Sequence, residues 1–301
     1  MSMIEKRTKV HHTVEVFKYA VMLAFALLTL LPFINLIAKS FSGEAPVMAG
    51  RVTFWPLSPT LQTYRWVLKG KTFLNALNVS LVVTLAGALA AVVITAMTAY
   101  PLSRSGFRGR RGFLYLWVFI MLFNGGIVPN YMLYKSIGLM DTLAALALPG
   151  LISVYNMLLI KNYFETLPDS LEEAARIDGA SNLRALFQII LPVSLPMMAT
   201  ITLFYAVGYW NDFFTARMYI SSVDKRPLQL YLYDLINSAL QIQNFGSDGN
   251  TGSFSADELM NLTPETVRAA AITLSTIPIL MTYPFLQKYF IKGIVIGSVK
   301  E

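Results

Sequence analysis

The chain has 301 residues, of which 55% are hydrophobic and only 14% charged, and its mean hydropathy is +0.55. Soluble domains carry about 25% charged residues, so this composition excludes an ordinary soluble protein. It predicts an all-α membrane protein with several spans. The chain has no Cys, which excludes disulfides and thiolate metal sites. The net charge of +7 is better explained by basic cytoplasmic loops than by nucleic-acid binding.

The N-terminal segment, residues 1–16, is basic and includes both histidines, His11 and His12. A pair of histidines in a tail is more typical of a solvated surface than of a metal site, so we predict neither a metal nor any cofactor bound by this chain. The apolar run that follows is too long for the core of a signal peptide and has no small-residue cleavage site after it. We therefore expect a retained first span.

Six segments have the roughly 20 apolar residues that a helix needs to cross a hydrocarbon core about 30 Å thick. Asn124-Gly125-Gly126 interrupts the third segment and Pro149-Gly150 the fourth. Broken helices are tolerated in a membrane where protein or a water-filled cavity satisfies the freed backbone groups, so these breaks fit either a lumen or ordinary kinks. The predicted spans are 17–38, 73–99, 113–134, 142–163, 193–216 and 269–291, within a transmembrane domain of residues 17–291.

Basic residues predict the orientation of these spans. The short loop between the second and third spans contains Arg104, Arg108, Arg110 and Arg111 and no acidic residue, which favours the cytoplasmic side. Both termini, including the tail 292–301, are then cytoplasmic, and the segments 39–72 and 217–268 are external. Within the external segments we expect a short helix at 61–68 and a flexible Gly-rich loop at 241–255.

The loop between the fourth and fifth spans, residues 167–192, predicts two short helices. Ser170 is a candidate N-cap, with Glu173 completing a capping box. Gly179 can adopt the left-handed conformation that ends a helix, and Ser181 can cap the next one. A short helix with an apolar face suits insertion into a groove on a partner protein. The apolar residues that would form this face are Leu171, Ala174, Ala175, Ile177, Leu183, Leu186 and Phe187.

The same loop resembles the EAA signature of ABC importer permeases, through Glu173-Ala174-Ala175, Gly179 and Ile189-x-Leu191-Pro192. The resemblance implies the type I ABC importer permease fold in a bacterial inner membrane, with this loop as the coupling helix that docks on a separate ATPase. Arg176 and Asp178 flank the turn, where pairing with the ATPase and a solvated role fit equally well. The coupling residues implied are Leu171, Glu173, Ala174, Ala175, Arg176, Asp178 and Gly179.

A narrower resemblance is to carbohydrate importers of the maltose-permease type, in the subgroup for complex polysaccharides. It rests on the segments 123–126, 148–150 and 204–211. That subgroup imports fragments of alginate, aldouronate and polygalacturonate. The resemblance implies four partners: an ATPase dimer that holds the ATP and Mg²⁺, a second homologous permease, an extracytoplasmic solute-binding protein reached by residues 241–255, and an oligosaccharide. Lipid surrounds the spans.

Polar and aromatic residues in the spans are candidates for a sugar path. Tyr205, Tyr209 and Asp212 are spaced to share one helical face. Tyr and Trp are equally typical of interfacial belts, and Asn of helix–helix contacts. Arg217, Lys225 and Arg226 near the predicted outer mouth fit either an anionic substrate or interface anchoring. The full candidate set is Asn124, Tyr131, Asn156, Tyr205, Tyr209, Trp210, Asn211 and Asp212.

Other functions fit the sequence less well. Gly70-Lys71-Thr72 resembles the end of a phosphate-binding loop, but Arg65 occupies the position of its first glycine. The chain is therefore not expected to hydrolyse ATP or to be an enzyme. A secondary transporter would show internal repeats and ionisable residues within its spans, and we find neither pattern. The nearer alternative is an ABC permease for neutral sugars or peptides.

Overall fold

The computed structural model describes residues 9–69, 71–123, 125–244 and 263–298, with side chains except at 9–13, 69, 176, 238–244 and 282–298. The regular elements in these ranges are all helical, which confirms the predicted fold class. The chain divides into two compact units. One unit comprises residues 1–70 and 235–276, and the other residues 71–234 and 277–301.

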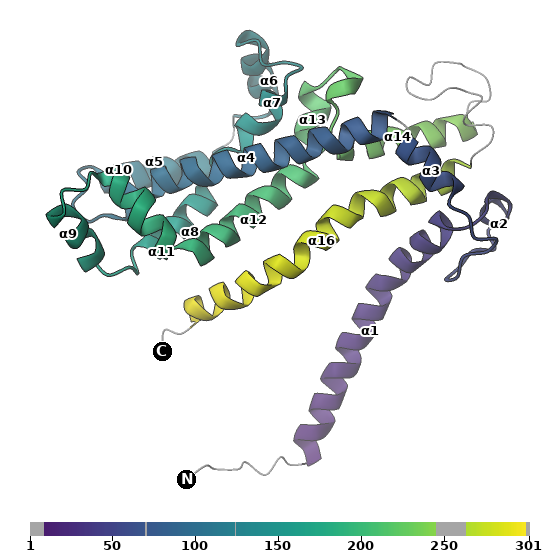
Figure 1. Ribbon diagram of the computed structural model, residues 1–301, viewed down its shortest axis with the longest axis horizontal. Coiled ribbons are helices and arrows are strands. Elements are labelled where there is room, and N and C mark those ends of the chain that lie inside the picture. Colours follow the sequence, from purple (N-terminus) through teal and green to yellow (C-terminus); the bar gives the residue numbers. More distant parts are fainter. Residues whose placement is uncertain (1–8, 70, 124, 245–262, 299–301) are drawn as a thin grey trace. The chain divides into compact units, whose positions relative to one another are not determined.

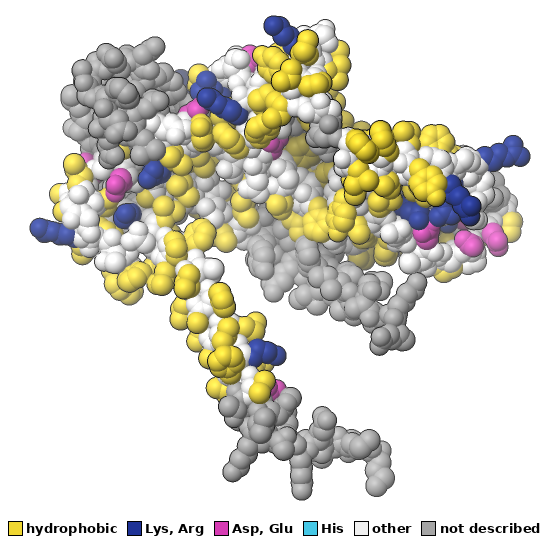
Figure 2. Space-filling model, turned by 180° about the vertical axis from the view of Figure 1, so that it is seen from behind, with side chains coloured by type: hydrophobic (Ala, Val, Ile, Leu, Met, Phe, Trp, Pro, Cys, Tyr) yellow, Lys and Arg dark blue, Asp and Glu magenta, His cyan; other side chains and the backbone are white. Residues whose placement is uncertain are grey.

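The first unit contains α1 (Lys9–Ser40), α2 (Glu44–Met48) and α3 (Gln62–Lys69). The segment after α1 folds back on the end of that helix. Ser42 Oγ accepts the N–H of Leu57 at 3.0 Å, and the hydroxyls of Ser40 and Tyr64 are hydrogen-bonded at 2.7 Å. Most of the apolar stretch Val14–Ser40 of α1 is exposed, including Leu23, Phe25 and Leu30, and its visible face carries mostly apolar side chains (Figure 2). Such a surface suits hydrocarbon rather than water.

The second unit is built around α4 (Lys71–Ser103), which packs against α12 (Leu195–Asn211) and α8 (Val154–Phe164) (Figure 1). The contact surface of α4 is rich in small residues. Ala88, Ala91, Ala96 and Ala99 are all buried. Small side chains allow helix backbones to approach closely within a membrane, where van der Waals packing must replace the hydrophobic effect.

Each of the six predicted spans falls on helix, and the two predicted breaks are confirmed. The third span is α5 (Arg110–Leu122) followed by α6 (Ile127–Ser136), and the fourth is α7 (Leu143–Ala147), the 3₁₀ turn η1 (Leu148–Gly150) and α8. Two helices, Val14–Ser40 and Lys71–Ser103, are individually long and apolar enough to cross a membrane, and three bent helix pairs pass the same test as pairs. The sixth predicted span lies within α16 (Pro264–Ser298).

The fifth predicted span differs in its boundaries. α12 ends at Asn211, and Asp212 has extended backbone before α13 (Phe214–Tyr219) begins. Asp212 therefore lies beyond the helix and does not share a helical face with Tyr205 and Tyr209. At the other end, the helical segment Asn182–Val193, which ends in α11 (Leu191–Val193), meets α12 at a bend of 90°. After α13 come η3 (Val223–Lys225) and α14 (Leu228–Asn244).

Of the predicted outer features, the short helix at 61–68 is present as α3. The predicted loop at 241–255 lies mainly outside the described residues. The assignment of membrane sides remains a prediction from the basic loops.

Candidate functional site

The loop 167–192 forms the predicted pair of short helices, α9 (Ser170–Ile177) and α10 (Asn182–Ala185). The N-cap is Asp169 rather than Ser170, because the N–H groups of Glu172 and Glu173 donate to the Asp169 carbonyl at 3.0 and 3.1 Å. Ser170 is therefore the first helical residue. The acidic side chains of Glu172 and Glu173 in the first turn suit the positive end of the helix dipole.

The turn after α9 has the predicted geometry. Gly179 has a φ of +73°, and the N–H of Ala180 donates to the carbonyl of Ala175 at 2.9 Å. This is the six-to-one hydrogen bond of a Schellman motif, which requires a left-handed residue and favours glycine. Ser181 Oγ accepts the N–H of Arg184 at 3.3 Å and caps α10. A π-helix, Leu186–Ile190, continues α10 toward α11.

The two sides of α9 have opposite environments. Glu172 and Ala175 face inward and are 8% and 3% exposed, whereas Glu173 and Ala174 are exposed and Ile177 is 86% exposed. The single apolar face predicted for this loop is therefore split. Ala175 and Leu186 pack inward; Ala174, Ile177, Leu183 and Phe187 are exposed. Ile177, Leu183 and Phe187 together expose several large apolar side chains on this segment, which makes it a candidate docking surface.

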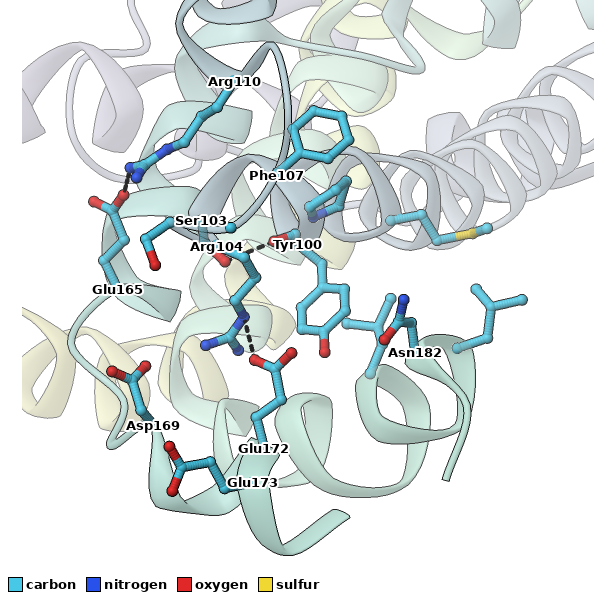
Figure 3. A pocket seen from close by; sticks show the side chains of 16 residues that line it. Tyr100, Ser103, Arg104, Phe107, Arg110, Glu165, Asp169, Glu172, Glu173 and Asn182 are labelled. Atoms are coloured by element: carbon cyan, nitrogen blue, oxygen red, sulfur yellow. Dashed lines mark hydrogen bonds and ion pairs between the residues drawn. The ribbon is translucent and has the colours of Figure 1, made fainter. Parts of the chain in front are cut away.

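A cleft of about 910 Å³ lies between this helix pair and the end of α4 (Figure 3). Two sets of ion pairs cross its walls. Arg104, directly after α4, places Nε 2.8 Å from Oε2 of Glu172. Arg110 at the start of α5 pairs with Glu165, and Lys161 Nζ contacts the same carboxylate at 2.8 Å. Charged side chains thus join α9 to the end of α4, and α5 to the end of α8.

The remaining coupling residues are placed as follows. Leu171 is partly buried, and Asp178 is exposed beside Gly179. The side chain of Arg176 lies outside the described residues. Arg104 and Glu172 were not among the predicted site residues. The sequence shows Arg104 as one of four arginines in a basic loop and Glu172 as one of two adjacent glutamates, and nothing in that pattern pairs them.

The candidate sugar-path residues separate into buried and exposed groups. Tyr205, Tyr209, Trp210 and Asn156 are buried. Tyr131 is 37% exposed, and Asn211 is exposed with its amide donating to the Val207 carbonyl at 2.9 Å. Asn124 lies outside the described residues. Asp212 is partly buried, and its carboxylate accepts the N–H of Thr215, in the first turn of α13, at 3.0 Å.

The buried tyrosines bind backbone groups at the break in the fourth span. Tyr209 Oη donates to the carbonyl of Ala147 at 2.7 Å. Tyr205 Oη accepts the N–H of Ser153 at 2.9 Å and is hydrogen-bonded to Thr95 Oγ1 at 2.7 Å. Because freed backbone groups inside a membrane must be satisfied by protein or water, both tyrosines have a structural task at these positions.

The three basic residues of segment 217–226 differ in their pairing. Lys225 Nζ donates to the carboxylate of Asp141 at 3.3 Å and to its carbonyl at 2.7 Å. Arg226 pairs with Asp234 at 2.8 Å. Arg217 is the most exposed of the three, with its Nη1 4.0 Å from Asp234 Oδ1 and its guanidinium 5.8 Å from the ring centre of Tyr233. Arg217 therefore retains the most accessible positive charge of the three.

Asp141 organises this region. Its carboxylate accepts the N–H groups of Ser221 and Ser222 at 3.0 and 2.9 Å and the hydroxyl of Ser222. These bonds favour the charged form. The hydroxyl and the N–H of Ser222, assisted by Ser221 and Lys225, hold the pKa of Asp141 well below its usual range. Within the described residues, no group of three or more His, Cys, Asp or Glu side chains could hold a metal ion.

Comparison with known proteins places this architecture in a family. The chain is 40% identical over 282 residues to the polygalacturonan/rhamnogalacturonan transport system permease protein YtcP of Bacillus subtilis (strain 168), covering 94% of this chain and 96% of that one. It is 43% identical over 276 residues to Protein LplC of the same organism, covering 91% and 90%.

Among solved structures, the chain matches one described as a bacterial ABC transporter involved in the import of the acidic polysaccharide alginate. The TM-score is 0.85 at 32% identity, and the match covers 94% of this chain and 98% of that one. The model of the binding-protein-dependent transport system inner membrane component family matches residues 20–296. The chain therefore belongs to the family of binding-protein-dependent transport system inner membrane components, whose members are non-catalytic permease subunits of ABC transporters.

Proposed function

We propose that this chain is one permease subunit of an ABC importer for oligosaccharides, and that α9 is the element through which a separate ATPase acts on it. The observation that carries the coupling role is the division of α9 into a buried side, Glu172 and Ala175, and an exposed side that ends in Ile177. The buried side holds the helix on the bundle, and the exposed side is left for a groove on another protein.

Acidic polysaccharide fragments are the proposed cargo. The support comes from the relatives, since YtcP is named for polygalacturonan and rhamnogalacturonan and the similar solved transporter for alginate. Arg217 adds an accessible cation. Neutral oligosaccharides are the second candidate, because a relative from Bacillus subtilis that is 28% identical over 296 residues is named for galactooligosaccharides.

The simplest way for this fold to form a transport pathway is between two permease subunits. We therefore include a second homologous permease, an ATPase dimer and an extracytoplasmic solute-binding protein in the proposal, with both termini of this chain cytoplasmic. Among the candidate path residues, Tyr131 and Asn211 have the accessible side chains that contact with a sugar requires.

The test of coupling is co-purification of a tagged chain with its cognate ATPase. Ile177→Asp places a charge on the exposed side of α9 without touching its buried side, and we expect the ATPase to be lost. Met48→Asp is the matched control, because Met48 on α2 is a similarly exposed apolar residue at 74%. Retention of the ATPase by Ile177→Asp, or its absence from wild type, would contradict the coupling role.

Cargo is tested on the complete importer in liposomes with its binding protein. We expect oligogalacturonate or alginate oligomers to stimulate ATP hydrolysis and galactooligosaccharides to leave it at the basal rate. Stimulation by the neutral sugar alone would favour the second candidate.

A further inference from the structure

Two adjacent glutamates of α9 have different surroundings. Glu173 is exposed on the side that we assign to the ATPase, whereas the Glu172 side chain is 10% exposed and lies against Arg104. The sequence signature contains Glu173. Both glutamates line the cleft, and Glu172 is the one that points toward Arg104 (Figure 3).

Arg104 is held from two directions at the end of α4. Its Nε lies 2.8 Å from Glu172 Oε2, and its Cζ lies 4.9 Å from the ring centre of Tyr100. The Arg104 side chain is 14% exposed, and its Nε and Nη2 are buried without a hydrogen-bond partner, so its contact with Glu172 is an ion pair rather than an aligned hydrogen bond. The Tyr100 ring in turn packs edge-on against Phe164, the last residue of α8. A guanidinium this buried depends on a nearby carboxylate to balance its charge.

The pair therefore connects α9 to the helix at the centre of the unit. α4 packs against both α12 and α8, so a displacement at its end is transmitted to the packed spans. We propose that Arg104 and Glu172 are the positioning residues that make α9 and the end of α4 move as one body, so that closure of the ATPase reaches the spans through α4. This inference rests on the coupling role proposed for α9.

The second set of ion pairs in the cleft does not serve the same purpose. Arg110, Glu165 and Lys161 join α5 to the end of α8, and their side chains do not belong to α9. The Arg104–Glu172 pair is also the less exposed of the two arginine–glutamate pairs, at 14% and 10% against 27% and 31%. Buried pairs are screened less by water and salt, so they hold a fixed geometry better.

The first experiment separates ATPase docking from transmission. Glu172→Gln removes the charge and keeps the shape, and it leaves the exposed side of α9 unchanged. In the reconstituted importer, we expect the ATPase to co-purify as with wild type, and binding-protein-stimulated ATP hydrolysis to fall about tenfold, within the usual range for coupling between sites. Arg108→Gln is the matched control, since it removes an exposed arginine from the same loop and should leave stimulation at the wild-type level.

The second experiment restores the connection covalently. The chain has no cysteine, so Arg104→Cys with Glu172→Cys introduces the only two thiols in this subunit. We expect the reduced protein to bind the ATPase but show weak stimulation, and a short thiol-reactive crosslinker to restore stimulation. The same preparation is compared before and after crosslinking, so this test stands even if Glu172→Gln lowers the yield of folded protein. The wild-type complex treated with the crosslinker corrects for thiols in the partner chains.

The outcomes distinguish the two proposals. Normal stimulation in Glu172→Gln, or a crosslinked pair that binds the ATPase but stays inactive, would overturn the transmission role and leave ATPase docking intact. Loss of the ATPase from folded Glu172→Gln would also overturn it, because Glu172 would then serve docking. Failure of wild type to capture the ATPase would instead refute the coupling role of α9, and this inference with it.

Discussion

The hydroxyl of Tyr209 donates a 2.7 Å hydrogen bond to the carbonyl of Ala147, and this bond crosses from α12 to the break in the fourth span. α7 ends at Ala147 and α8 begins at Val154, with a bend of 49° between the two halves. One turn earlier on α12, Tyr205 accepts the N–H of Ser153. The two tyrosines thus satisfy backbone groups on both sides of the break, so their structural role explains their spacing without a sugar ligand.

The first prediction concerns this hydrogen bond. Tyr209→Phe leaves the partly buried Ala147 carbonyl without this donor, which should lower the free energy of unfolding by about 0.5–1.5 kcal/mol. Thermal unfolding of the detergent-solubilised protein measures the change. Tyr155→Phe is the control, because Tyr155 lies on α8 and is 59% exposed. Equal unfolding temperatures for Tyr209→Phe and wild type would show that water replaces the tyrosine at this carbonyl.

The second prediction concerns two glycines that make room for the Tyr209 ring. A Cβ at Gly87 would lie 3.0 Å from ring carbons of Tyr209, and a Cβ at Gly150 would lie 2.9 Å from its hydroxyl. Overpacking a tight site costs about 1–3 kcal/mol, and the helix preference for alanine over glycine offsets about 1 kcal/mol of this, so Gly87→Ala should destabilise the protein by up to about 2 kcal/mol.

Gly208→Ala on α12 is the opposite case. A Cβ there meets nothing within 4 Å, and alanine is favoured over glycine inside a helix by about 1 kcal/mol. Thermal unfolding should therefore show a lower midpoint for Gly87→Ala and an unchanged or higher one for Gly208→Ala. The reverse order would refute the tight contact.

The sequence predicts features that depend on local chemistry. The breaks at Gly125-Gly126 and Pro149-Gly150, the left-handed turn at Gly179 and the cap at Ser181 follow from residues within a few positions of each feature. The predicted N-cap, Ser170, lies one residue too late, because Asp169 competes with Ser170 for this position and both are good capping residues.

Features that depend on distant contacts could not be predicted. Along the chain, α5, α6, α7 and α8 lie between Arg104 and Glu172. Nothing in the local sequence distinguishes Glu172 from Glu173. The path candidates Tyr205 and Tyr209 have the spacing of a lumen face, but that spacing also fits two hydroxyls reaching the broken span. Deciding between the two needs the position of the Ala147 carbonyl, which depends on how α7 packs.

The third prediction concerns the turn after α9. Gly179 has a φ of +73°, and a Cβ added there would meet no other atom within 4 Å. Gly179→Ala is therefore opposed by backbone strain alone, which costs about 1–2 kcal/mol. Asn tolerates this conformation better than Ala. Hydrogen exchange at residues 177–181 should therefore increase most in Gly179→Ala and less in Gly179→Asn. Equal exchange in both variants would show that side-chain contacts, rather than the positive φ, determine the effect.

The fourth prediction follows from the lowered pKa of Asp141, which the hydroxyl and N–H of Ser222 cause first. A carboxyl whose pKa is lower in the folded state than in the unfolded state stabilises the protein above its unfolded pKa, about 3.9, and loses that effect as pH falls toward its folded pKa. Asp141→Asn removes the charge at a residue with a φ of +57°, a conformation that Asn also tolerates. The difference in unfolding midpoint between wild type and Asp141→Asn should therefore be constant from pH 7 to about pH 5 and shrink below about pH 4. A difference that grows on acidification would mean that the folded protein favours the protonated carboxyl, opposite to what its hydrogen bonds indicate.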